Sequence, residues 1–270
     1  MRTIVQLSDL HFGRLLPETV EPCLEAVRSL DPNLVIISGD LTQRARKWQY
    51  AQAKSFLAAL PRPQLVLPGN HDVPAYNLYR RLVQPLDRYK RIITRDLSPR
   101  FIDDEIAVFG INTARSLVIK GGRINPEQLE LVEAQVQSLT DNQVRIVVTH
   151  HPLDIPPGLE GVRLVGGADA AMQAFARCKI DLFLAGHLHL VFYGSTQRYG
   201  IPGYDVPILQ AGTTISSRAR GEPNSFFVHR VGRDEITTET HQWNPGLGSF
   251  AVSDIRTFER EPAGWAMRAS

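Results

Sequence analysis

Short apolar runs recur along the first two thirds of the chain, and Gly, Asp or His residues bound most of them. Continuous apolar runs of this length are typical of strands that are buried on both faces, as in a parallel sheet. The runs that predict strands are Ile4–Leu7, Leu34–Ile37, Leu65–Leu67, Ile106–Ile111, Ile146–Val148 and Leu182–Leu184.

Segments with the helical spacing of apolar residues separate several of these strands. The clearest begins at Pro126, because Asn125 can cap it, Pro126 suits the first helical position and Gln128 completes a capping-box start. The pattern predicts helices that connect the strands over Pro17–Leu30, Trp48–Leu60, Pro126–Leu139 and Ala168–Cys178.

The pattern changes after His189, where strand-like stretches follow one another through Gly/Pro turns without a helix between them. These stretches suggest an antiparallel sheet. Strands and helices that alternate, followed by consecutive strands, predict an α/β fold: a four-layer α-β-β-α sandwich of two packed mixed sheets. The late strands expected are Leu190–Tyr199, Pro207–Gln210, Ser225–Val231 and Glu235–Gln242.

Composition is ordinary for a globular protein with a buried core. The 270 residues are 43% hydrophobic and 21% charged, which suits one large domain. The formal charge of +2 creates no field that would indicate nucleic acid or a membrane surface as a partner.

The cysteines and the N-terminus indicate a cytoplasmic protein. Cys23 and Cys178 lie far apart in apolar, helix-like segments, so we expect neither a disulfide nor a thiolate metal site. The first strand begins almost at once, which leaves no room for a signal peptide. No apolar run approaches the roughly 20 residues that span a bilayer.

Five short polar motifs each follow one of the predicted strands. Ligands at the carboxyl ends of neighbouring strands meet in one crevice of an open α/β sheet, so we expect these motifs to form one site. The motifs are Asp9-Leu10-His11, Gly39-Asp40, Gly69-Asn70-His71-Asp72, Thr149-His150-His151 and Gly186-His187-Leu188-His189.

The chemistry of these side chains predicts two metal ions. Carboxylate, imidazole and amide ligands without thiolate suit Mn, Fe or Zn, and the set exceeds what one ion needs. Two ions roughly 3.5–4 Å apart can clamp a phosphoryl group and turn a bridging water into hydroxide, which favours phosphoester hydrolysis. Taken singly, Asp40 could be a helix cap and Gly69-Asn70 a tight turn, but the order and strand-end context of all five favour the metal site.

In this order the motifs resemble those of the calcineurin-like metallophosphoesterase superfamily. Its pattern of D-x-H, G-D, G-N-H-D/E, H and G-H-x-H is matched between about residues 3 and 190. The wording around Ser8-Asp9, Ser38-Gly39-Asp40 and the Arg218–Ser225 segment resembles the class III cyclic-nucleotide phosphodiesterase branch. The resemblance implies one metallophosphoesterase domain over residues 1–270.

The resemblance also implies a division of labour within the site. Asp9, His11 and His189 would hold the first metal, while Asn70, His150 and His187 would hold the second and Asp40 would bridge both. His71 would be a non-ligand histidine that acts on the substrate phosphate or leaving group, with Asp72 holding its imidazole. A turn role for Asp72 remains open.

Other candidates depend on weaker patterns. His151 would lie behind the ligands or at the rim, and Asn112 would face the crevice or simply form a turn. Arg218 and Arg220 would bind a phosphate or lie on a solvated loop. Tyr76 and Tyr79 would stack on a base or, as the better alternative, pack on the apolar face of a short amphipathic helix. His229 and His241 are interpreted as ordinary strand residues.

Four functions remain to be compared. The leading one is a phosphodiesterase for small substrates such as cyclic nucleotides, acting through a hydroxide that bridges two metals. A nuclease has support only from the basic segment between Arg80 and Arg91, so nucleic acid is a less favoured partner. A phosphomonoesterase or a nucleotide pyrophosphohydrolase of the same superfamily is an alternative, whereas the complete ligand set argues against a non-catalytic scaffold.

The sequence leaves several properties of this protein open. A homo-oligomer is compatible with it, and the loop 152–167 and the segment 218–225 are expected to select the substrate.

Overall fold

Two mixed sheets form the centre of the fold in the computed structural model, which describes residues 1–75, 78–116, 121–159, 161–262 and 264–268. In the first sheet β1, β2 and β3 are parallel, and β10 joins β1 in antiparallel orientation. Its order is β13 (Gly264–Met267), β12 (Ser249–Glu261), β11 (Glu235–Asn244), β10 (Ser225–Val231), β1 (Arg2–Leu7), β2 (Leu34–Ser38) and β3 (Gln64–Leu67).

The second sheet is parallel in its middle and antiparallel at its two edges. Its order is β4 (Arg100–Ile102), β5 (Ile106–Gly110), β6 (Val144–Val148), β7 (Leu182–Ala185), β9 (Pro207–Gln210) and β8 (Phe192–Ser195). Side chains from β1, β2 and β3 pack against this sheet in one core, so the two sheets lie face to face.

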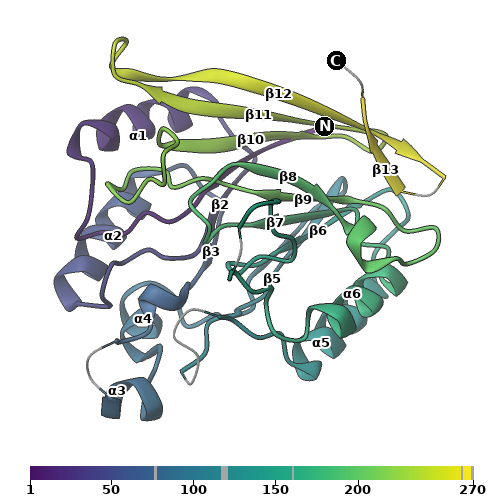
Figure 1. Ribbon diagram of the computed structural model, residues 1–270, viewed down its shortest axis with the longest axis horizontal. Helices are drawn as coiled ribbons and strands as arrows, with labels where there is room; N and C mark the ends of the chain where they lie inside the picture. The colour runs from purple at the N-terminus through teal and green to yellow at the C-terminus, as the bar shows by residue number, and fades with distance from the viewer. Residues whose placement is uncertain (76–77, 117–120, 160, 263, 269–270) are drawn as a thin grey trace.

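Helices cover the outer face of each sheet, as Figure 1 shows. On the first sheet, Val27 of α1 (Val20–Ser29), Phe56 of α2 (Lys47–Ala59) and Tyr89 of α4 (Asp87–Ile92) share a core with β1 and β2. On the second, Val132 of α5 (Pro126–Val136) and Phe175 of α6 (Ala168–Arg177) complete the other core. The predicted four-layer sandwich is therefore confirmed.

The late part of the chain differs from the predicted antiparallel sheet. The stretch predicted as the strand Leu190–Tyr199 divides into β8 and a 3₁₀ helix, η3 (Thr196–Tyr199), and β9 pairs in parallel with β7. These two strands therefore belong to the second sheet. Of the predicted late strands, β10 and β11 form the expected antiparallel region, and the unpredicted strands β12 and β13 extend it.

Several elements were not among those that the sequence predicted as strands or helices. The longest is β12, whose mixture of exposed and half-buried positions lacks a continuous apolar run because one of its faces borders solvent. The predicted helix Pro17–Leu30 begins with the 3₁₀ turn η1 (Pro17–Thr19), and the helix from Pro126 ends three residues early. The others are β4, β13, α3 (Leu78–Val83), α4 and the 3₁₀ turn η2 (Asn70–Asp72).

Among the described residues, no helix combines the length and the apolar character needed to cross a membrane. Cys23 and Cys178 are both buried free thiols, in agreement with the expectation that they form no disulfide.

Buried polar side chains connect the two sheets below the ends of the strands. Gln6 of β1 donates from its side-chain nitrogen to Ser38 Oγ (3.1 Å) and to the carbonyl oxygen of Ala185 (2.9 Å) in the second sheet. His229 lies 3.1 Å from Gln6 Oε1 and 2.9 Å from Thr238 Oγ1. Gln6 and His229 are completely buried, so leaving their polar atoms without hydrogen bonds would be costly. The need for these bonds fixes how the two sheets meet.

Burial of His229 should make the stability of the protein depend on pH. Because burial lowers the pKa of His229 to about 3, the unfolded chain binds a proton below about pH 6.5 that the folded chain resists. As the pH is lowered from about 6.5 towards about 3, this side chain should therefore reduce the free energy of unfolding by about 1.4 kcal/mol per pH unit. We expect metal-free wild type to lose about 2 kcal/mol more than His229→Gln between pH 7 and pH 4.5 in urea titrations. Equal losses would contradict this assignment.

Candidate metal centre

The polar motifs converge where the carboxyl ends of strands from both sheets meet. The loop after β7 bonds to the loop after β1, since the backbone N–H of His187 donates to Asp9 Oδ2 (2.8 Å). His150 Nδ1, after β6, lies 2.8 Å from the carbonyl oxygen of Ser38 at the end of β2. The predicted convergence of distant motifs is thus present, and it draws on both sheets.

One cluster of donor atoms combines Asp9, His11, Asp40 and His189. His189 Nε2 lies 3.0 Å from His11 Nε2 and 3.1 Å from Asp9 Oδ1. Asp40 contributes its Oδ2, which lies 3.6 Å from His11 Nε2. The four side chains are buried, and their donor atoms lie within 4.8 Å of one another.

A second cluster forms around His150 on the other side of Asp40. His150 Nε2 lies 3.2 Å from Asn70 Oδ1, 3.3 Å from His187 Nδ1 and 3.4 Å from Asp40 Oδ1. The two oxygens of Asp40 therefore face different clusters. Asp40 is thus placed where its carboxylate could contribute to an ion in either cluster.

The backbone at these residues is unusual. Asp9, His11, Asp40, His187 and His189 all adopt positive φ, between 47° and 75°. For residues other than glycine this left-handed conformation costs roughly 1–2 kcal/mol each, and such strain is concentrated at functional sites.

The glycines of the motifs allow the loops to approach one another. A Cβ atom on Gly69 would collide with Asp40 Oδ1, and one on Gly186 would collide with Ser8 Oγ. Glycine is therefore required at both positions by lack of space.

Electrostatic coupling inside the clusters is strong. Burial alone would raise the pKa of Asp9, but His189 and His11 outweigh it and hold this pKa well below its usual range. Burial lowers the pKa of His11 to about 4 and that of His187 to about 3, so both imidazoles are neutral and able to offer a lone pair. Burial opposes a charge on His150, yet the carboxylate of Asp40 raises the pKa of His150 to about 9.

These residues fit metal ions. Asp9 Oδ1 is buried without a hydrogen-bond partner, although two imidazole nitrogens point toward it. Two adjacent buried carboxylates also need positive charge nearby. Oxygen and nitrogen donors without sulfur match Mn, Fe or Zn.

His151 lies directly beside the second cluster. Its ring is 4.7 Å from that of His187, and its Nδ1 is 2.7 Å from Thr113 Oγ1. The other nitrogen, Nε2, is buried without a partner. The structure thus brings His151 to the centre, behind His187.

Asp72 does not hold the imidazole of His71, which corrects the predicted catalytic role. Its carboxylate accepts hydrogen bonds from the backbone N–H groups of Leu41, Thr42 and Gly69 (2.9–3.0 Å). His71 Nδ1 instead lies 2.9 Å from the carbonyl oxygen of Gln43. Asp72 is therefore a turn residue that ties the second and third motifs together; its burial and the nearby Asp40 raise its pKa to about 7.

Asn112 is also used locally, since its side-chain oxygen accepts from the N–H of Ala114 (3.0 Å). This bond favours the turn alternative over a substrate contact. Tyr79 is 68% exposed, so it does not pack in the core, and Tyr76 lies outside the described residues. His229 and His241 are ordinary strand residues, as expected; His241 lies 3.0 Å from Glu239.

Arg218 belongs to the centre, whereas Arg220 lies at its margin. Arg218 Nη1 lies 3.0 Å from His71 Nε2 and 3.3 Å from His11 Nε2, and the carbonyl oxygen of Arg218 faces His189 Nδ1 at 2.9 Å. Arg220 is exposed and acts on Arg218 through its charge. The backbone of the 218–225 segment therefore orients one predicted ligand.

Two further residues of the site were not predicted from the sequence. Ser8 Oγ donates to Asp9 Oδ2 (2.6 Å), and Gln43 holds His71 through its backbone carbonyl. Ser8 directly precedes the first motif and Gln43 lies three residues after Asp40, and this proximity in the chain is the signal that could have found them.

Comparisons with known proteins agree with this geometry. A family model described as calcineurin-like phosphoesterase matches residues 2–191, which is more than half of the chain. The chain belongs to this family. It is therefore a metal-dependent phosphoric ester hydrolase, and the clusters of His and Asp side chains fit the dinuclear metal centre of this family.

Relatives in this family extend over most of the chain. A protein named as a probable glycerophosphodiester phosphodiesterase, GpdQ, from Arcobacter nitrofigilis is 30% identical over 88% of this chain and 92% of its own length. The 3′,5′-cyclic adenosine monophosphate phosphodiesterase CpdA of Escherichia coli K12 is 25% identical over 69% of each chain. Both agree with the class III resemblance.

A solved structure with the same fold is a dimetal phosphatase from Danio rerio. It superposes with a TM-score of 0.67 at 13% identity, covering 93% of this chain and 98% of its own. At this identity the likeness shows the fold.

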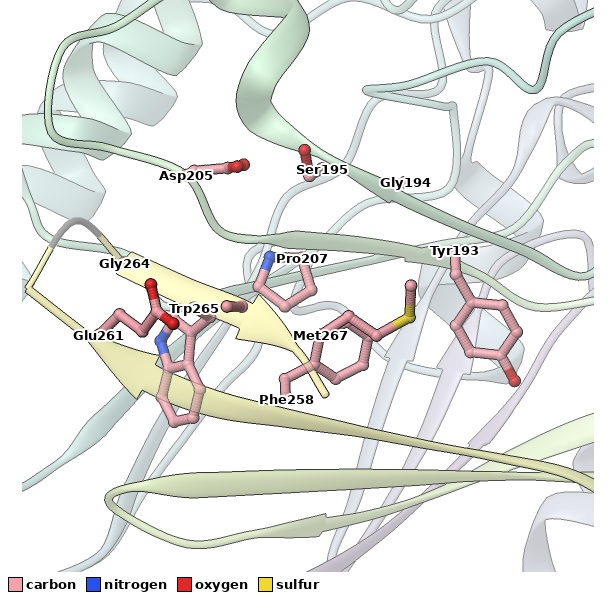
Figure 2. A pocket seen from close by; sticks show the side chains of 11 residues that line it. Tyr193, Gly194, Ser195, Asp205, Pro207, Phe258, Glu261, Gly264, Trp265 and Met267 are labelled. Atoms are coloured by element: carbon pink, nitrogen blue, oxygen red, sulfur yellow. The ribbon is translucent and has the colours of Figure 1, made fainter. Parts of the chain in front are cut away.

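A separate cavity of about 450 Å³ lies where β8 and β9 face the hairpin of β12 and β13. Figure 2 shows Trp265, Phe258, Met267 and Tyr193 along it. Its lining includes none of the predicted site residues, so it is distinct from the metal centre.

Proposed function

We propose that this hydrolase is a phosphodiesterase for small substrates such as cyclic nucleotides. The observation that supports it most is the division of the two Asp40 oxygens between two donor clusters, with His71 and Arg218 beside one of them. Relatives that match most of the chain are named as phosphodiesterases, which favours a diester over a monoester as the substrate.

Seven residues would hold the two ions in this proposal. Bound ions would activate water and stabilise the charge on the phosphoryl oxygens. The first ion would use the cluster of Asp9, His11 and His189, the second the cluster of Asn70, His150 and His187, and Asp40 would belong to both.

Two side chains would bind and protonate the substrate. Arg218 can donate to the phosphate, and its position between His11 and His71 places its charge over the centre. Gln43 accepts a hydrogen bond from His71 Nδ1, so Nε2 is the ring nitrogen that faces Arg218 and the centre. With a proton on each ring nitrogen, His71 would donate the one on Nε2 to the leaving oxygen. His71 is thus the proposed general acid.

The nuclease alternative has little support, because the basic segment serves the fold. Arg88 donates to the carbonyl oxygen of Ala45 (2.7 Å), and Arg91 pairs with Asp87. Charges that are already bound within the protein contribute less to a nucleic-acid surface.

A hydrolysis panel with Mn²⁺ tests the proposal. We expect bis-p-nitrophenyl phosphate and 2′,3′- or 3′,5′-cyclic nucleotides to be hydrolysed at least about tenfold faster than p-nitrophenyl phosphate, a difference of about 1.4 kcal/mol in transition-state stabilisation. Single-stranded DNA should remain intact. A preference for p-nitrophenyl phosphate, or degradation of DNA as the fastest reaction, would replace the proposed substrate class.

A further inference from the structure

A cavity lined by arginines opens beside the metal centre, on the side of His71. Its volume is about 440 Å³, within the roughly 300–1,000 Å³ of small-molecule sites. Three loops and the start of α2 form its walls, and its described lining contains no acidic residue. The arginines are Arg14, Arg44, Arg46 and Arg218.

Backbone hydrogen bonds hold the walls of this cavity in place. Gln49 Oε1 accepts from the N–H groups of Arg44 (2.9 Å) and Arg46 (3.2 Å). The N–H of Ser217 donates to the carbonyl oxygen of Arg14 (2.8 Å), which joins the first loop to the third. The cavity is therefore built before any ligand arrives, which lowers the entropic cost of binding.

Three of the arginines that line the cavity carry charges that no ion pair among the described residues neutralises. Within the part of the chain that the structure describes, the ion pairs involve none of Arg14, Arg46 and Arg218. Burial lowers the pKa of Arg218, and the charges of Arg220 and Arg44 add to this effect against the pull of Asp40 and Asp9. Several like charges held together favour an anion with more than one negative charge.

A second feature indicates what else this ligand carries. Gln43 is 8% exposed and lines the cavity, and its side-chain oxygen is buried without a hydrogen-bond partner among the residues that the structure describes. That oxygen requires an O–H or N–H donor. Trp48, on the same wall, is 49% exposed and offers an aromatic face.

We propose that the arginine-lined cavity binds a second phosphate group of the substrate while the scissile diester lies at the metal centre. This inference rests on the proposed function and narrows its substrate class to hydroxyl-bearing diesters with an additional phosphate, such as short nucleotides. The guanidinium groups of Arg14 and Arg46 bind that phosphate, and Gln43 accepts a hydrogen bond from a hydroxyl of the same ligand.

Two dinucleotides that differ by one phosphate test this inference. With Mn²⁺ present, kcat/KM for pApA should exceed that for ApA by at least about tenfold, a gap of about 1.4 kcal/mol. Arg14→Gln/Arg46→Gln should bring this ratio close to one. Arg233→Gln, an exposed arginine in the turn between β10 and β11, is the matched control and should keep it. A wild-type ratio near one, or a double variant that retains the preference, would overturn the inference.

Binding without hydrolysis separates this inference from the proposed function. Calorimetry on metal-free protein should show adenosine 3′,5′-bisphosphate binding at least about tenfold tighter than adenosine, and the double variant should lose this difference. If that pattern is found but no diester is hydrolysed, the anion site stands and the proposed function fails. Equal affinities for the two ligands in wild type would overturn the site even if diesters are hydrolysed.

Discussion

Asp40→Asn should lose metal and activity together, with kcat/KM on bis-p-nitrophenyl phosphate reduced by at least about 10³-fold, or about 4 kcal/mol. The two oxygens of Asp40 face different clusters, at 3.4 Å from His150 and 3.6 Å from His11. An amide keeps one oxygen, replaces the other by a donor and removes the negative charge. Both proposed ion positions are therefore damaged by a single change.

Elemental analysis after reconstitution with Mn²⁺ measures the loss directly. We expect about two ions per wild-type chain, as two donor clusters imply, and less than one in Asp40→Asn. Asp154→Asn is a suitable control, because Asp154 is also a buried aspartate but pairs with Arg198 (2.6 Å) away from the clusters. Two ions in Asp40→Asn would disprove the bridging role.

His71→Ala should keep both ions and lose activity by on the order of 10²–10⁴ on substrates with a poor leaving group. His71 Nδ1 is held by the carbonyl oxygen of Gln43, and Nε2 faces Arg218 rather than a proposed ligand. A cyclic nucleotide needs a proton on its leaving oxygen, whereas p-nitrophenolate leaves without one. The loss should accordingly be larger on 3′,5′-cyclic AMP than on bis-p-nitrophenyl phosphate.

The control for this experiment is His241→Gln, which changes a histidine that pairs with Glu239 on β11. Metal content and thermal denaturation of both variants distinguish a catalytic effect from unfolding. Full activity of His71→Ala on the cyclic nucleotide, or an equal loss on both substrates, would remove His71 from the role of general acid.

The sequence could predict those site residues that directly follow recognisable strands. Asp9, Asp40 and His150 each follow a continuous apolar run, and parallel strands bring such positions to one edge. The role of Asp72 could not be predicted in this way. Whether its carboxylate faces His71 or the backbone of Leu41 depends on how the η2 turn meets the neighbouring loop, which no local pattern encodes.

The same reason applies to the arginine-lined cavity. Arg14 and Arg46 lie in separate loops. Backbone hydrogen bonds between these loops, such as that from the N–H of Gln43 to the carbonyl oxygen of Phe12 (3.0 Å), and the bonds made by Ser217 and Gln49 bring the two arginines to one cavity. The strand β12 was missed for a different reason, because solvent on one face breaks up the apolar pattern that revealed the buried strands.

The donor clusters draw on both sheets, and this links metal supply to folding. In the first proposed ion position Asp9 follows β1 and His189 follows β7. In the second, Asn70 follows β3 and His187 follows β7, so separating the sheets would take both positions apart. Ions that bind only the folded chain stabilise it in proportion to RT ln(1 + [metal]/Kd). A shortage of metal would then lower the amount of folded protein as well as its activity, and the cell would lose the enzyme through degradation of unfolded chains.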